Sequence, residues 1–350
     1  MKYINEIIMR YKRIRNRQHL KNIYSNKYAF VGIGGHSVNN LYPVLYYLGV
    51  RLKYICCKSQ GNVELIKKRT DIMATTSLAD IMTDDEIKGV FVSVSVDTNF
   101  EISKKVLDSG KFLFVEKPPC RSKKELDCLI DLADNNKVAV TMVGVQKRYS
   151  PIMQTLCRRL KGERCLSYNM KYLTGLYPEG DALLDLFIHP LDCACFLFGK
   201  AKVTGIDYVR QSNGALTLML LLTHKNAKGM VELSTGYTWA NAIEQLTINT
   251  KNGVYVQDQM ENLKFYHKSG SIFGIPVEKI VHRSPVVVEL YGRNNFVPTI
   301  ANNQIHTQGY FNEIKTFVDA VEYNNDSKVC SSLRMLENTY DLIGEIRKML

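Results

Sequence analysis

The sequence predicts an α/β protein in which an N-terminal, doubly wound parallel sheet precedes an α+β domain with a large, mainly antiparallel open sheet. At 350 residues the chain exceeds the size at which one core keeps growing, so two domains are expected. Short apolar runs alternate with amphipathic segments over residues 28–143. After Pro151 the pattern changes to strand-like stretches separated by turn signals. The hydrophobic content of 45% is typical of a globular protein.

The first domain is predicted from this alternation of strands and helices. The expected strands are 28–31, 52–57, 90–96, 112–115 and 138–143. The expected helices are 39–48, 62–68, 100–107 and 123–135. Alternation of this kind implies right-handed crossovers and a parallel sheet covered on both faces.

The second domain is predicted to be rich in strands. The expected strands are 166–173, 204–209, 215–223, 228–235, 244–250, 253–257 and 262–267. Hairpin signals lie between them at Asn213-Gly214 and Asn252-Gly253. Helical patterns follow over 309–323 and 331–349. We therefore divide the chain into an extension over 1–26, a first domain over 27–148 and a second domain over 149–350.

The net charge of +12 is unevenly distributed along the chain. Residues 1–27 contain eight Lys or Arg and one acid, a charge of +7, so the other 323 residues carry +5. We therefore expect no binding of nucleic acid by the body. No run of about 18 uncharged apolar residues exists, and no transmembrane segment is expected. Nine cysteines without a C-x-x-C pair indicate core thiols rather than a metal site, which suits a reducing, cytoplasmic location.

The N-terminal extension has the pattern of a basic amphipathic helix. Ile4, Ile7, Ile8, Tyr11 and Ile14 recur at helical spacing, and most of the basic residues fall off that stripe. Two interpretations are open at this point. The helix packs on the body or on a sister subunit, or it contacts an anionic membrane surface or an acidic partner.

A glycine-rich turn follows the first expected strand. Gly32, Gly34 and Gly35 lead into His36 and Ser37 before a helical segment. Such a turn lets backbone N–H groups approach a pyrophosphate at the start of a helix, as in dinucleotide-binding Rossmann domains. An ordinary tight turn has the same composition, and Ser37 stands where a third glycine is usual. The position between a strand and a helix favours the nucleotide interpretation.

The end of the second expected strand bears on the choice of cofactor. An acid there would bind the ribose 2′-hydroxyl, but the chain has Lys58 and Ser59 instead. A lysine and a hydroxyl can bind a 2′-phosphate, which favours NADP(H), with NAD(H) the alternative. The other interpretation is that Lys58 is a solvated loop residue.

Two further segments contain residue types suited to proton chemistry. Glu116-Lys117-Pro118 follows a strand of the parallel sheet, where ligands are usually bound. A lysine there can protonate or orient an oxygen, although Lys-Pro is also a common surface turn. Asp185 and His189 are four residues apart, so one helix would place both on the same face. A histidine of this kind is often structural instead.

These motifs and Gly144–Pro151 together resemble the glucose-fructose oxidoreductase, inositol dehydrogenase and rhizopine-catabolism (Gfo/Idh/MocA) family. The resemblance implies a Rossmann domain, a nicotinamide cofactor, and a second domain whose open sheet builds homodimers or homotetramers. It implies hydride transfer between NAD(P) and a secondary alcohol or ketone of a sugar, cyclic polyol or nucleotide sugar. Lys117, Asp185 and His189 would be catalytic, with His189 exchanging the proton and Lys117 orienting the oxygen.

The same resemblance implies two sets of binding residues. The cofactor would contact Gly32, Gly34, Gly35, His36, Ser37, Lys58, Ser59, Ser93, Val94, Glu116, Lys117, Gln146 and Arg148. The substrate would contact Lys117, Arg148, Tyr172, Asp185 and His189. Departures from the family pattern at Ser37 and Phe100 keep a second hypothesis open, namely a non-catalytic protein of the same fold that senses a nucleotide.

Overall fold

The computed structural model describes residues 2–17, 24–281, 286–296 and 299–350. The chain divides into two compact units. Unit 1 consists of Met1–Glu116, Asp131–Met142 and Ile314–Val329, and unit 2 consists of Lys117–Ile130, Val143–Glu313 and Cys330–Leu350. The chain thus crosses between the units several times, whereas the sequence analysis placed one boundary between residues 148 and 149.

Unit 1 is built on a parallel sheet, as predicted. Among the described residues six strands have the order β3-β2-β1-β4-β5-β6, which is the doubly wound arrangement of a Rossmann domain. The strands are β1 (Lys27–Val31), β2 (Arg51–Cys56), β3 (Met73–Thr75), β4 (Ile87–Val92), β5 (Phe112–Glu116) and β6 (Thr141–Gly144). The pairs β2–β3, β1–β2, β1–β4 and β4–β5 are all parallel.

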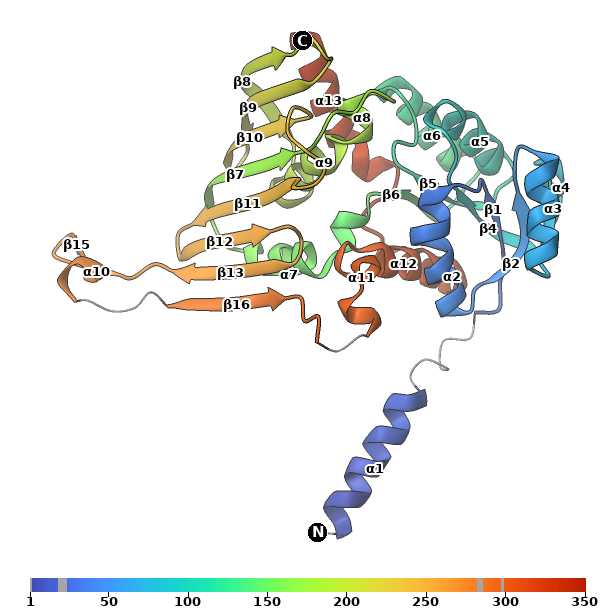
Figure 1. Ribbon diagram of the computed structural model, residues 1–350, viewed down its shortest axis with the longest axis horizontal. Helices are drawn as coiled ribbons and strands as arrows, with labels where there is room; N and C mark the ends of the chain where they lie inside the picture. The colour runs from blue at the N-terminus through green and yellow to red at the C-terminus, as the bar shows by residue number, and fades with distance from the viewer. Residues whose placement is uncertain (1, 18–23, 282–285, 297–298) are drawn as a thin grey trace. The chain divides into compact units, whose positions relative to one another are not determined.

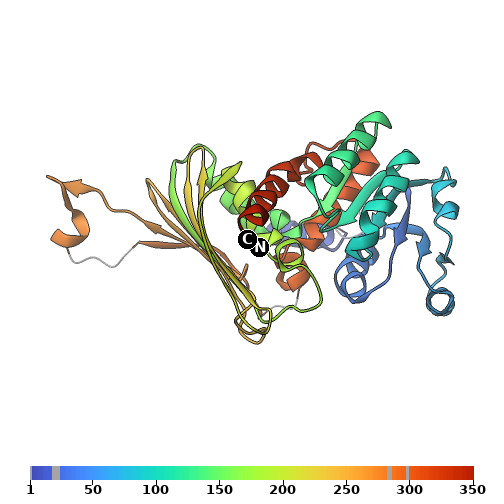
Figure 2. The ribbon, with the colours of Figure 1, turned by 90° about the horizontal axis from the view of Figure 1, so that it is seen from above.

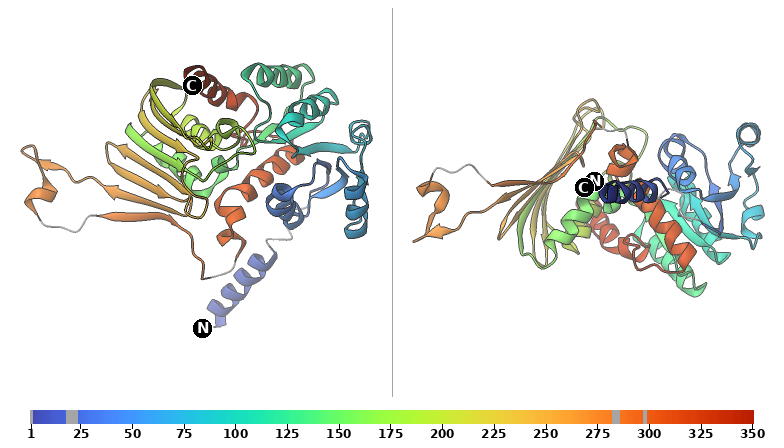
Figure 3. Two further views of the ribbon diagram at one scale, coloured as in Figure 1. Left: turned by 45° about the horizontal axis from the view of Figure 1, so that its top comes forward. Right: turned by 90° about the horizontal axis from the view of Figure 1, so that it is seen from below.

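Helices lie on both sides of this sheet (Figure 3). They are η2 (Ser37–Leu41), α2 (Tyr42–Leu48), α3 (Gln60–Arg69), α4 (Ala79–Met82), α5 (Val96–Asp108), α6 (Lys123–Asn135) and α12 (Tyr310–Tyr323). Phe317 of α12 packs against Phe91 of β4 and Phe114 of β5, with ring centroids 5.0 and 5.6 Å apart. This aromatic contact explains why residues 314–329, from near the end of the chain, belong to unit 1.

One expected strand is displaced in the structure. The sequence analysis placed a strand over 90–96, but β4 ends at Val92 and α5 begins at Val96. The last parallel pair joins Val92 to Val31, and β1 also ends there. Residues 93–95 lie past the end of β1 and leave the sheet, and the Ser95 carbonyl accepts the first helical hydrogen bonds of α5.

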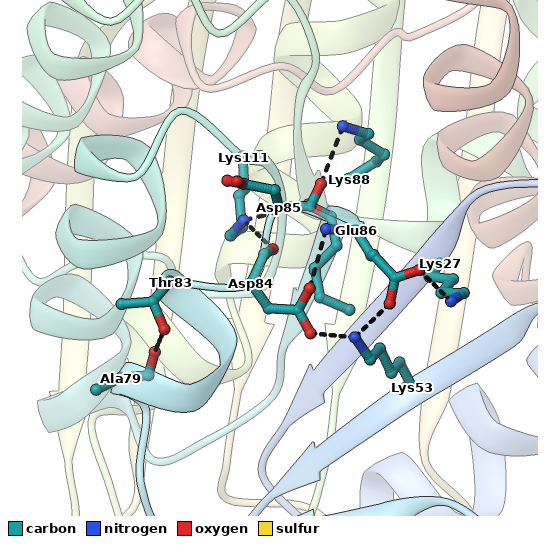
Figure 4. Close-up of polar contacts among 10 residues, drawn as sticks. Lys27, Lys53, Ala79, Thr83, Asp84, Asp85, Glu86, Lys88 and Lys111 are labelled. Carbon is teal, nitrogen blue, oxygen red and sulfur yellow. Dashed lines mark hydrogen bonds and ion pairs between the residues drawn. The ribbon is translucent and has the colours of Figure 1, made fainter.

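An ion cluster ties the amino ends of the parallel strands together (Figure 4). Lys27 and Lys53 both bind Glu86, with nitrogen–oxygen distances of 2.5 Å, and Lys53 also binds Asp84. The buried Lys111 donates to the carbonyls of Asp84 and Ile87, and burial lowers its pKa. The glycine turn follows the carboxyl end of β1, so this cluster is at the opposite edge of the sheet.

Unit 2 is built on the large sheet in Figure 1, which is mainly antiparallel as predicted. Among the described residues eight strands have the order β16-β13-β12-β11-β7-β10-β9-β8, and only the pair β7–β10 is parallel within them. The strands are β7 (Cys165–Leu173), β8 (Ala201–Arg210), β9 (Leu216–His224), β10 (Lys228–Ser234), β11 (Ile243–Thr250), β12 (Gly253–Asp258), β13 (Asn262–His267) and β16 (Val287–Gly292). A small hairpin joins β14 (Ser271–Ile272) to β15 (Ile275–Pro276).

Helices gather on one face of the large sheet (Figure 2). They are η3 (Gln146–Tyr149), α7 (Pro151–Leu160), α8 (Ala182–Asp185), α9 (Ile188–Phe198) and α13 (Glu337–Met349). Shorter helical segments are α10 (Val277–Ile280), η4 (Ile300–Asn302), α11 (Gln304–Thr307) and η5 (Arg334–Leu336). Helices α9 and α13 pack on β8. The sequence analysis missed α7, although Ser150 caps it and Pro151 occupies its first turn.

The N-terminal extension contains helix α1 (Lys2–Arg17) in its described part. Residues 24–26 already belong to the folded body, because the Tyr24 hydroxyl donates to Asp319 and the Asn26 N–H donates to Glu322. A search of the described helices finds none that is long and apolar enough to cross a membrane.

Candidate functional site

The glycine turn at the end of β1 requires glycine at its first position. Gly32 has a φ of +106°, and a Cβ there would lie 2.0 Å from the Ser93 carbonyl oxygen. Its N–H donates to the Cys56 carbonyl at 2.8 Å. Gly32 therefore lets the backbone of β1 turn between the ends of β2 and β4, which no residue with a side chain could do without strain.

The other two glycines face open space. A Cβ on Gly34 or Gly35 would meet no atom within 4 Å. The buried Ser37 closes the turn, because its hydroxyl accepts from the Gly34 N–H at 2.9 Å and donates to the Gly34 carbonyl at 3.0 Å. Ser37 thus holds the loop and engages one N–H group that a pyrophosphate could otherwise bind.

The helix after this turn begins earlier than the sequence analysis placed it. Expected over 39–48, it is already helical before η2, and it continues through α2 to Gly49. Pro43 has no N–H to donate, and the Tyr42 N–H reaches back to the Ser37 carbonyl in a wider π-helical turn. The chain therefore absorbs the proline without breaking the helix.

A cleft of about 680 Å³ opens in unit 1 at the carboxyl ends of β1, β2 and β4. Eight of the predicted cofactor residues line it, namely Gly32, Gly34, Gly35, His36, Ser37, Lys58, Ser93 and Val94. The sequence analysis missed several polar lining residues, namely Asn62, Thr76, Ser95 and Thr98. Hydroxyl and amide groups after successive strands are the signal that could have identified them. Such a cleft fits a nucleotide.

Lys58 and Ser59 have different environments at the end of β2. Lys58 is exposed and lines the cleft. Ser59 caps α3, where its hydroxyl accepts from the Asn62 N–H at 3.3 Å, and it is not among the residues described as lining the cleft. The described lining residues include no carboxylate. The direct binding of a 2′-phosphate by Ser59 stays a prediction.

His36 and Glu116 meet within unit 1. The His36 Nε2 lies 3.2 Å from a carboxylate oxygen of Glu116, and its Nδ1 lies 3.2 Å from the Asn40 amide nitrogen. Glu116 ends β5 and is buried, while His36 is partly exposed. The contact joins two residues that the sequence analysis assigned to the cofactor, and it connects the glycine turn to the end of β5.

Lys117 begins unit 2 directly after β5. Its ammonium donates to the backbone carbonyl of Asp185 at 2.6 Å. The Asp185 carboxylate lies 3.4 Å from the Tyr177 hydroxyl, which donates to it. Burial raises the pKa of Asp185, and the charge of Lys117 acts in the opposite direction. The structure thus brings Lys117 and Asp185 together through the carbonyl of Asp185.

The segment containing Asp185 and His189 is two helices rather than one, so the expected shared helical face is wrong. Helix α8 ends at Asp185 and α9 begins at Ile188. Pro190 has no N–H that could donate to the Leu186 carbonyl. The His189 N–H donates to that carbonyl instead, at 3.2 Å, which makes the turn tighter. His189 is buried in the first turn of α9.

Tyr177 and Gly180 belong to this cluster and were missed in the sequence. A Cβ on Gly180 would lie 2.2 Å from a carboxylate oxygen of Asp185, so glycine is needed for that close approach. Burial and the neighbouring Asp185 raise the pKa of Tyr177 to about 12. A glycine after a tyrosine in the segment that follows β7 is the signal that could have identified them.

Arg148 and Gln146 are buried in η3. The Arg148 Nε and Nη2 donate to the two carboxylate oxygens of Asp192 at 2.8 and 2.6 Å. The same guanidinium donates to the carbonyls of Cys330 and Met335. This set of partners gives Arg148 a structural role in unit 2. Its contact with cofactor or substrate, like that of Gln146, stays a prediction.

Tyr172 lies beside an ion pair between Lys147 and Glu244. The Lys147 ammonium is 4.8 Å from the centre of the Tyr172 ring and binds Glu244. Burial alone would lower the pKa of Lys147, but the attraction of Glu244 outweighs it and the pKa is raised. Within the described part of the chain, no three His, Cys, Asp or Glu side chains are placed to hold a metal ion.

The comparisons with known proteins agree with this geometry. Residues 26–144 match the family described as an oxidoreductase family with an NAD-binding Rossmann fold. The match covers about a third of the chain. The resemblance inferred from the sequence is therefore confirmed, and the matched residues contain the glycine turn, Lys58 and Lys117.

Curated relatives are similar to this chain at low identity. Inositol 2-dehydrogenase of Rhizobium meliloti is 20% identical over 250 residues, which are 68% of this chain and 71% of that protein. UDP-N-acetylglucosamine 3-dehydrogenase of Acidithiobacillus ferrooxidans is 25% identical over 204 residues. That match covers 55% of this chain and 62% of the relative, which is less than two thirds of its length.

Solved structures show that the fold extends beyond the first domain. A dehydrogenase from Chromobacterium violaceum superimposes with a TM-score of 0.77 at 18% identity. The match covers 93% of this chain and 96% of that protein. The predicted combination of a Rossmann sheet with a mainly antiparallel sheet is thereby confirmed.

Proposed function

We propose that this protein is a nicotinamide-dependent oxidoreductase that transfers a hydride between NAD(P) and a secondary alcohol or ketone of a sugar, cyclic polyol or nucleotide sugar. The observation that carries the proposal is the cluster of Lys117, Asp185 and Tyr177 directly after the last residue of β5. Lys117 is bonded to the backbone carbonyl of Asp185, and the Asp185 carboxylate accepts from the Tyr177 hydroxyl. A lysine, a carboxylate and a phenol gathered in this way suit proton transfer better than packing. The names of the two curated relatives support this class of substrate.

The nucleotide would be held by unit 1. Gly34 and Gly35 leave open space beside the turn, and the cleft of about 680 Å³ offers polar groups after successive strands. When bound, the nicotinamide accepts or donates the hydride. Lys58 at the cleft and the lack of a carboxylate among the described lining residues favour NADP(H), and NAD(H) is the alternative.

The proton chemistry would come from unit 2. During oxidation the substrate carbon loses a hydride, and the hydroxyl proton passes to His189 as the carbonyl forms. Lys117 would donate a hydrogen bond to the reacting oxygen, and its bond to the Asp185 carbonyl fixes the direction of its side chain. Reduction uses the same groups in reverse.

The decisive experiment is the variant Lys117→Ala. We expect turnover on a sugar and polyol panel to fall by about 10²–10⁴-fold, because a positioned proton donor is lost. Fluorescence titration should show that the variant still binds NADPH, and binds it more tightly than NADH. The exposed Lys105 offers a matched control, and Lys105→Ala should leave turnover unchanged. Unaltered turnover in Lys117→Ala would remove Lys117 from the mechanism.

A second function, nucleotide sensing without catalysis, is favoured by one observation. The Gly34 N–H donates to the Ser37 hydroxyl, so the turn has one backbone N–H fewer to offer a pyrophosphate. A sensor would bind nucleotide and show no turnover across the panel, whereas the enzyme would show both.

As further parts of the proposal we expect a homodimer or homotetramer formed through the large sheet, and a cytoplasmic location.

A further inference from the structure

Helix α1 presents an apolar stripe to solvent. Ile4, Ile7, Ile8, Tyr11 and Ile14 are between 44% and 62% exposed. At 100° per residue these five side chains occupy one face of the helix. Five large apolar side chains left exposed on a single helix face indicate a binding surface rather than scattered surface residues.

The rest of α1 is strongly basic. Residues 2–17 contain six Lys or Arg and one acid, a formal charge of +5. On the helical projection Arg10 and Lys12 flank the apolar stripe on its two sides, and Arg13 lies opposite it. Basic side chains at both borders of an apolar face can reach the headgroups while the apolar side chains enter the acyl region.

We propose that α1 binds an anionic lipid surface, lying in the plane of the interface with its apolar stripe inserted. The charge of α1 argues against pairing with a second copy, because two such helices would bring two charges of +5 together without acids to neutralise them. The remainder of the chain offers no acidic surplus either, since residues 28–350 carry a formal charge of +5. An anionic bilayer provides both an apolar phase and negative charge.

Flotation of the full chain with lipid vesicles tests this proposal. Vesicles that contain phosphatidylglycerol should bind the protein, and vesicles of phosphatidylcholine alone should not. Replacing Arg10, Lys12 and Arg13 together by Gln should weaken binding by about 100-fold, because each basic residue near an anionic surface contributes a separate attraction. Raising the salt concentration should weaken binding of the unaltered chain.

A matched pair of apolar substitutions separates a lipid surface from other partners. Ile7→Ser removes a side chain from the stripe and should weaken binding by about 10-fold. Met9→Ser removes an exposed apolar side chain from the opposite face and should have little effect. Equal losses for both variants, or equal binding to the two kinds of vesicle, would overturn the proposal.

Two other outcomes would assign α1 to a different partner and also overturn the proposal. A fall in the molecular mass by sedimentation in Ile7→Ser, without loss of vesicle binding, would indicate contact with a second copy. Binding to single-stranded nucleic acid that is equally tight in the unaltered chain and in Ile7→Ser would indicate a general polyanion site. Nucleotide binding by unit 1 serves as the check that each variant is folded.

Discussion

The Arg148–Asp192 ion pair shows how single residues hold unit 2 together. Both side chains are buried, and the Thr339 hydroxyl also donates to Asp192 at 2.9 Å. A buried pair of this kind adds little when complete, because the loss of hydration offsets the attraction between the charges. Removing one partner is costly, because it leaves a buried charge without compensation.

Asp192→Ala should therefore lower the free energy of unfolding by about 3–5 kcal/mol, as measured by urea denaturation. Asp207 lies on β8 and is exposed, so Asp207→Ala should change the free energy by less than about 0.5 kcal/mol. Similar values for the two variants would show that the Arg148 pair does not stabilise the fold.

His224 is a buried residue whose surroundings favour one state of protonation. Its ring nitrogens contact the Tyr168 hydroxyl and the Gly199 carbonyl, both at 2.8 Å. Burial lowers the pKa of His224 below its ordinary value of 6.5. The folded state therefore favours the neutral ring, and the stability it contributes is present above the unfolded pKa of 6.5 and is lost as the pH falls toward the folded pKa.

We expect the free energy of unfolding to fall as the pH is lowered from about 7.5 to about 5.5, because the unfolded chain then binds a proton that the folded state resists. Urea denaturation at several pH values measures this slope. In His224→Gln the slope should be smaller, whereas His267→Gln, a change on the exposed end of β13, should leave it unaltered. An identical slope in His224→Gln would assign the acid sensitivity to other groups.

At the scale of elements, the strand–turn–helix unit around Gly32 borders the cleft in which we propose that a nucleotide binds. The turn connects β1 to the π-helical η2, and its close contact with Ser93 leaves no room for a side chain. Two other glycines of unit 1 differ from it. Gly34 has open space around it, and so does Gly61 in the first turn of α3.

Gly32→Ala should abolish nucleotide binding, because a Cβ would displace the Ser93 carbonyl and the positive φ disfavours alanine. Gly61→Ala should leave binding intact and stabilise the protein by up to about 1 kcal/mol, because alanine has the higher helix propensity. Titration with NADPH and thermal unfolding measure the two effects. Retained binding in Gly32→Ala would mean that the cleft beside the turn is not the nucleotide site.

At the scale of the whole molecule, the uncovered face of the large sheet is suited to contact another subunit. Met219 and Leu221 of β9 and Met230 of β10 are exposed on it, and Leu221 pairs directly with Met230 across the strands. Adjacent exposed apolar residues on a broad sheet favour association. The face opposite the helices is therefore our candidate for the homo-oligomer interface.

Leu221→Glu combined with Met230→Glu should lower the molecular mass measured by sedimentation, because both changes place charge in the expected interface. Leu65→Glu is the matched control, since Leu65 is equally exposed but lies on α3 of unit 1. The same mass in both proteins would exclude this face as the interface. A chain that is already monomeric would also contradict the prediction.

Several features of this protein could be predicted from local sequence. The order of strands and helices follows from the period of apolar residues, because burial of one face imposes that period on each segment. The glycine turn could be predicted because a strand, a run of glycines and a helix follow one another directly in the sequence. The close approach of Gly32 to Ser93 after β4 could not be predicted in this way. Lys117 could be located because its motif directly follows a strand of the parallel sheet.

Only the tertiary structure decided which distant segments meet. The contact of Phe317 with Phe91, the pairing of Arg148 with Asp192 and the bond from Lys117 to the Asp185 carbonyl join residues far apart in the chain. The spacing of apolar residues does not identify such partners, because it reflects which face of a segment is buried and not which distant segment packs against that face. The sequence by itself therefore determined most of the elements and the residue types suited to proton chemistry, while packing decided the composition of the two units and the partners of each buried polar side chain.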